Sequence, residues 1–105
     1  MFGGGSYEEV GRWLLGFVNS HAKRESPRVE GIVEAGDGRA GQTFGVRLRL
    51  GEDYEPPLAE PAIELPFDEV AVGKGSLAWC QSEGARVRGW ARRLLETEAA
   101  ASGSR

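Results

Sequence analysis

The run QTFGVRLRL at 42–50 constrains the fold more than any other part of this chain. Large apolar residues alternate there with glycine and arginine, which is the period of two expected of a strand with one buried face. The apolar residues are Phe44, Val46, Leu48 and Leu50. A second alternation occupies 28–35, and the glycine-rich GDGRAG separates the two runs. We predict an antiparallel hairpin. Its exposed face would carry Arg47, Arg49, Glu30 and Glu34.

Helical patterns lie on both sides of these strands. Ser6 and Glu9 form a capping box, which predicts a helix from about residue 7 to residue 23. A second helix should run from about Ser76 to Glu96. The predicted apolar stripe of the first helix is Tyr7, Val10, Leu14, Phe17 and His21. The predicted core face of the second is Leu77, Cys80, Gly84, Val87, Ala91 and Leu94.

A third strand is expected in AIELPF, after the acidic, proline-rich loop at 51–61, and residues 68–72 either continue this edge or form a loop. The fold class is therefore α+β. The predicted architecture is a two-layer sandwich, helix–three antiparallel strands–helix, with both helices on one face of the sheet. We expect a single domain over 6–97, with a flexible N-terminus at 1–5 and a flexible C-terminal tail at 98–105.

Several kinds of function are disfavoured by the composition. The only cysteine, Cys80, cannot form an internal disulfide, and no apolar run approaches the roughly 20 residues of a membrane span. We therefore expect a cytoplasmic protein that does not associate with membranes. We predict no cofactor, no metal site and no catalytic residue. A nucleophilic pair of Cys80 with His21 is conceivable, but a buried thiol and a histidine at a helix end is the favoured interpretation.

The stretch GKGS at 73–76 resembles a phosphate-binding loop only superficially. The nucleotide-hydrolase type requires a glycine five residues before the Gly-Lys pair and a serine or threonine directly after the lysine. Asp68 and Gly75 occupy these positions. We therefore predict a turn in which Ser76 caps the final helix.

Charge is distributed unevenly along the chain. Residues 51–72 contain seven acidic and no basic side chains, whereas 73–105 contain six basic and three acidic ones. The simplest expectation is that the acidic segment packs beside the arginines of the final helix.

One line on the final helix combines two tryptophans with two arginines: Trp79, Arg86, Trp90 and Arg93. The tryptophans could widen the core beneath exposed arginines, or the line could bind protein, or it could bind nucleic acid. Among these functions we favour a non-enzymatic interaction domain that binds a protein partner, or a second copy of itself as a homodimer. The open sheet edge near 62–66 could contribute. A small-ligand pocket between helices and sheet is a third class of function.

The order of elements resembles the double-stranded-RNA-binding domain, with the VGKGS turn before the second helix. In that family the second helix opens with a lysine cluster, whereas LAWCQSE follows Ser76 here. The resemblance implies a nucleic-acid-binding module as the alternative function, and it assigns no binding residue to this chain.

Overall fold

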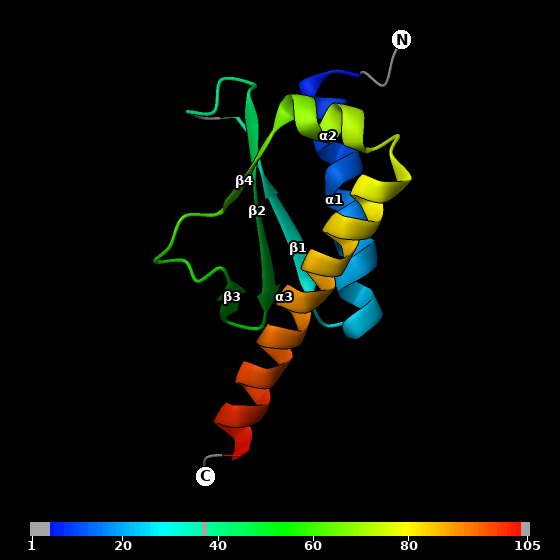
Figure 1. Cartoon of the computed structure of the whole chain (residues 1–105). Helices are drawn as coiled ribbons and strands as arrows, with labels where there is room; N and C mark the ends of the chain where they lie inside the picture. The colour runs from blue at the N-terminus through cyan, green and yellow to red at the C-terminus, as the bar shows by residue number, and fades with distance from the viewer. Residues whose placement is uncertain (1–4, 37, 104–105) are drawn as a thin grey trace.

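The computed structural model describes residues 5–36 and 38–103 as an α+β fold of two layers (Figure 1). One layer is an antiparallel sheet, and the helices cover one of its faces, as the sequence predicts. In chain order the elements are α1 (Tyr7–Glu25), β1 (Glu30–Glu34), β2 (Thr43–Leu50), β3 (Asp53–Glu55), β4 (Ile63–Pro66), α2 (Phe67–Gly73) and α3 (Leu77–Gly103). The expected flexibility of residues 1–4 and 104–105 lies outside the described residues.

Strand β2 is the centre of the sheet. Its partner on one side is β1, in a register that places Ile32 opposite Arg47. On its other side β2 pairs first with β4 and then with β3, so two short strands occupy the place of the single third strand that was predicted. The segment 56–62 leaves the sheet between them and follows a cis peptide bond at Glu55–Pro56.

This excursion of the chain buries Arg47, which the sequence analysis placed on the exposed face. Arg47 is only 7 % exposed. Its guanidinium donates hydrogen bonds to the carbonyl oxygens of Pro56, Pro57 and Glu60, at 3.0, 2.8 and 2.8 Å. It also forms the predicted cross-strand ion pair with Glu34, at 3.3 Å. The prediction of exposure was wrong because strand alternation specifies a face, but not whether a later loop covers that face.

The core lies between the helices and the inner face of the sheet. All four apolar residues predicted for β2 are buried, at 3 % exposure or less. In α1, Val18 and Ala22 occupy the buried positions, whereas the predicted Phe17 and His21 are only partly buried. The buried residues of α1 differ from the predicted stripe because α1 contacts α3 as well as the sheet. Phe17 and His21 face α3 rather than the strands.

Residues 67–73 form the short helix α2, rather than a strand edge or a loop. Pro66 precedes the first turn, where Asp68 and Glu69 complement the positive end of the helix. Val70 and Ala71 are buried, so packing stabilises this helix, which is too short to be stable alone.

The turn after α2 caps α3 as predicted, because Ser76 Oγ accepts a hydrogen bond from the backbone N–H of Trp79 at 3.2 Å.

Helix α3 differs from its prediction at both ends. Gly84, Val87, Ala91 and Leu94 are buried as expected and Cys80 is partly buried, but Leu77 is 74 % exposed. The helix also continues past Glu96 to Gly103, extending beyond α1 and the sheet (Figure 1). Ala99, Ala100 and Ala101 favour helix intrinsically, and Glu98 accepts two hydrogen bonds from Arg28, at 2.8 and 2.7 Å.

Candidate functional site

Helix α3 separates two flanks of the molecule with different neighbours. On one flank it runs beside α1 in the same direction, since Trp79 contacts Trp13 and Arg92 contacts Glu25. On the other flank it contacts β2 and β3. The four residues proposed to bind a partner do not share one environment.

Trp79 belongs to an aromatic cluster at the start of α3. Its ring centroid lies 6.1 Å from that of Trp13 and 5.7 Å from that of Phe17. Its indole N–H donates to Glu69 Oε2 of α2 at 2.9 Å, and its ring packs against the backbone of Gly73, where a β-carbon would overlap it. These contacts fasten α3 to α1 and α2. Trp79 is thus held within the fold, with part of its surface accessible.

Arg86, Trp90 and Arg93 lie on one side of α3, because they are spaced four and three residues apart along the helix. The guanidinium of Arg86 lies over the ring of Trp90, 5.3 Å from its centroid, and is also paired with Glu83 at 2.9 Å. Arg93 reaches across to β3 and pairs with Glu55 at 2.8 Å. The Arg86 and Arg93 side chains remain 44 % and 64 % exposed, so solvent screens both ion pairs.

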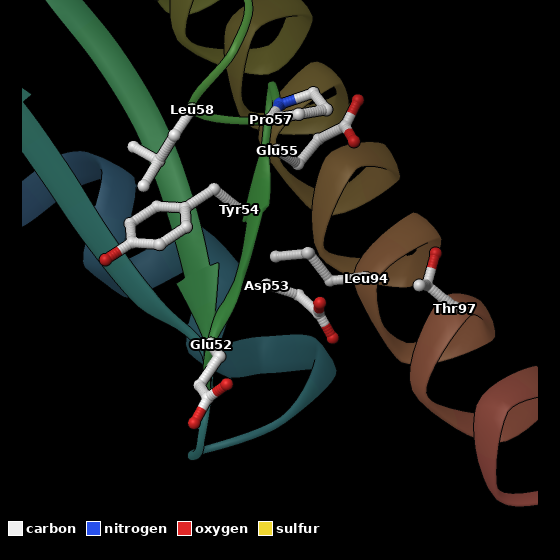
Figure 2. Close-up of a pocket in the computed structure, with 8 residues that line it drawn as sticks. All are labelled: Glu52, Asp53, Tyr54, Glu55, Pro57, Leu58, Leu94 and Thr97. Carbon is white, nitrogen blue, oxygen red and sulfur yellow. The ribbon is translucent and has the colours of Figure 1, made fainter.

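The ion pair of Arg93 stands at the border of a groove between β3 and α3, shown in Figure 2. The groove has a volume of about 300 Å³. Asp53 and Glu55 lie on the side of β3 that faces α3, where Leu94 and Thr97 form the opposite wall (Figure 2). Tyr54 and Leu58 point to the other side of β3, and Leu58 is 63 % exposed.

The acidic segment packs beside the arginines of α3 less extensively than expected. Glu55 is the only carboxylate of 51–72 that forms an ion pair with α3, within the residues that the structure describes. Glu64 instead pairs with Arg39, and Glu69 accepts from Trp79. Glu52 and Asp53 have no ion-pair partner among the described residues, and they leave negative charge at the groove.

No protein-family model matches this chain, and no curated protein or solved structure matches it significantly.

Two residues considered for catalysis, His21 and Cys80, line a second groove between α1 and α3. They do not form a hydrogen-bonded pair. The thiol of Cys80 donates to the carbonyl oxygen of Gly73 at 3.6 Å, and His21 Nδ1 lies 2.7 Å from Arg88 Nη1. Sequence reasoning placed both residues on apolar faces and did not anticipate Arg88, because only the packing of α3 on α1 brings the arginine to the imidazole.

In the described part of the chain, the His, Cys, Asp and Glu side chains do not come together in threes as a metal-binding group. None of its helices combines the length and the apolar character that a membrane span needs.

Proposed function

We propose that this domain is a non-enzymatic protein-binding module, and that its binding surface is formed by Arg86, Trp90 and Arg93 together with the groove between α3 and β3. The observation that carries the proposal is the guanidinium of Arg86 over the ring of Trp90, 5.3 Å from its centroid, on an accessible helix surface. Tryptophan and arginine are enriched at interface hot spots, where a planar ring and a planar cation together offer a large contact area.

The charge of this surface favours a basic partner segment. Two arginines, Arg86 and Arg93, are each neutralised by a glutamate of the same chain. Glu52 and Asp53 then remain without an ion pair within the described residues. A lysine or arginine of the partner would gain Coulomb energy beside them, and an adjacent apolar side chain would contact Leu94. A polyphosphate backbone would be repelled at the same place, which favours protein over the nucleic-acid alternative.

The proposal is tested by truncation on α3 with a control of equal charge change. Arg86→Ala with Trp90→Ala removes the guanidinium and the ring that it covers, and it places no new charge beside Glu52 and Asp53. Arg12→Ala with Leu15→Ala makes the same change in net charge and removes an exposed apolar side chain from α1. Both double variants, and the parent domain, would be used to capture partners after nuclease treatment, and their masses in solution would be measured by light scattering.

We expect a nuclease-resistant partner that the control variant retains and the α3 variant loses, with affinity at least roughly tenfold lower. A change in mass confined to the α3 variant would identify the partner as a second copy of the chain. If both variants retain the same partners and the same mass, the surface has no such role. If partners are recovered only without nuclease, nucleic acid is the ligand and the proposal fails.

A further inference from the structure

A groove between α1 and α3 combines positive charge with apolar surface. Its volume is about 320 Å³. The residues that line it are His21, Arg24, Leu77, Cys80, Gln81 and Arg88. It lies on the flank of α3 that faces α1, away from the surface proposed above for protein binding. Among the residues that the structure describes, no aspartate or glutamate lines it.

The position of His21 in this groove is determined by close packing. A β-carbon at Gly84 would lie 2.5 Å from Cε1 of His21, so only glycine at that position allows the imidazole to rest against α3. Phe17 supports the imidazole, with its ring centroid 4.7 Å away. Arg88 Nη1 then lies 2.7 Å from Nδ1. A guanidinium only donates, so Nδ1 is the acceptor and the neutral imidazole carries its proton on Nε2.

The arginines of the groove lack the partners that most other arginines of this chain have. Within the described residues, four arginines have no carboxylate at ion-pair distance: Arg12, Arg24, Arg49 and Arg88. Two of the four line this one groove, in a chain of net charge −3. Burial, followed by the charges of Arg24 and Arg88, lowers the pKa of His21. The groove thus carries positive charge that no acidic side chain offsets among its described lining residues.

We infer that this groove binds a small organic oxyanion, a carboxylate or phosphate attached to an apolar body. Arg24 and Arg88 would pair with the oxyanion, and the Nε2–H of His21 is available as a further donor. The apolar body would cover Leu77, which is otherwise 74 % exposed at the rim. Charge-assisted hydrogen bonds to the anion and burial of this leucine are the two sources of affinity.

The chain contains its own reporter for this binding, because His21 is its only histidine. The imidazole proton resonances can therefore be followed by NMR without assignment of the whole spectrum. Hexanoate and hexyl phosphate would be titrated into the full chain, with hexan-1-ol as the neutral probe and inorganic phosphate as the anion alone. We expect a saturable shift with at least one of the two hexyl anions. Bound anion should also raise the pKa of His21, since it offsets the positive charges that lower that pKa.

Three substitutions make the experiment decisive. Arg24→Gln and Arg88→Gln should each weaken the binding of the hexyl anion at least about tenfold, whereas Arg49→Gln, on the sheet, should leave it unchanged. Arg24 is exposed, so its variant tests the site even if loss of the His21 contact unfolds the Arg88 variant. The relative affinities of hexanoate and hexyl phosphate distinguish a carboxylate ligand from a phosphate.

The proposal is overturned by any of three results. These are no saturable shift with either hexyl anion up to about 10 mM, an equal loss in the Arg24 and Arg49 variants, or equal affinity for hexan-1-ol. If inorganic phosphate binds as tightly as hexyl phosphate, the inference that the ligand has an apolar body is wrong.

Discussion

Arg47 Nη2 lies 2.8 Å from the carbonyl oxygen of Glu60, and this bond closes the chain excursion that divides the outer strand of the sheet into β3 and β4. The same guanidinium also holds the carbonyls of Pro56 and Pro57 and the carboxylate of Glu34. One side chain therefore holds the segment that interrupts the pairing of β2 with its outer neighbours β4 and β3.

Replacement of Arg47 should destabilise the domain. Arg47→Met keeps most of the apolar stem but leaves carbonyl oxygens without donors, so we expect a loss of about 2–4 kcal/mol in the free energy of unfolding. Arg49→Met, two residues along the same strand at an exposed position, should change it by less than about 0.5 kcal/mol. Urea denaturation followed by circular dichroism measures both, and equal effects of the two substitutions would contradict the assigned role.

Two glycines of α3 should respond in opposite directions to alanine. At Gly84 the new methyl group would overlap His21, and we expect destabilisation by about 1–3 kcal/mol. At Gly89 a β-carbon would meet nothing within 4 Å, so the higher helix propensity of alanine should raise stability by up to about 1 kcal/mol. Thermal unfolding of the two variants would reveal the sign of each change. Stabilisation by Gly84→Ala would mean that His21 does not pack there.

The hydroxyl of Tyr7 joins the first turn of α1 to the sheet. It donates to the carbonyl oxygen of Thr43 and accepts from the backbone N–H of Gly36 at 3.3 Å. We expect Tyr7→Phe to lower the free energy of unfolding by about 0.5–1.5 kcal/mol. Tyr54→Phe removes a hydroxyl for which the described structure shows no hydrogen bond, and it should be neutral in the same denaturant titration. An effect of Tyr54→Phe as large as that of Tyr7→Phe would contradict this account.

Arg39 and Glu64 should make part of the stability dependent on pH. The hydrogen bond from Arg39, with a further one from Thr43, lowers the pKa of Glu64 below its ordinary value of 4.5. A carboxyl whose pKa is lower in the folded state contributes stability above its unfolded pKa, and that contribution disappears as pH falls through the folded value. Parent and Arg39→Met should therefore differ most above pH 4.5 and converge at lower pH.

The measurement is urea denaturation of both proteins at several pH values between about 2 and 7. Arg49→Met is the matched control, because Arg49 donates to the carbonyl oxygen of Gly51 rather than to a carboxylate. The interpretation fails if the difference between parent and Arg39→Met is constant throughout this range.

The candidate binding surface was only partly predictable. The contact of Arg86 with Trp90 follows from their spacing of four residues on a helix, and this spacing predicts that both lie on one line. The pairing of Arg93 with Glu55 joins residues 38 positions apart, and no local pattern identifies it. Trp79 was assigned to the same line. Its packing against α2 could not be predicted, because α2 itself was not predicted.

The sequence by itself determined the local features of this protein. The alternation in β2 specified its buried face. The Ser6–Glu9 capping box marked the start of α1, and the capping residue Ser76 marked the start of α3. Tertiary structure decided which distant segments cover these elements: the 56–62 excursion buries Arg47, which was predicted to be exposed, and α3 packs against His21 at Gly84. The physical reason is the distance along the sequence over which each effect acts. Periodicity and capping involve residues within one or two turns of each other. Burial depends on which distant segment packs against a surface, and this is determined only when the whole chain folds.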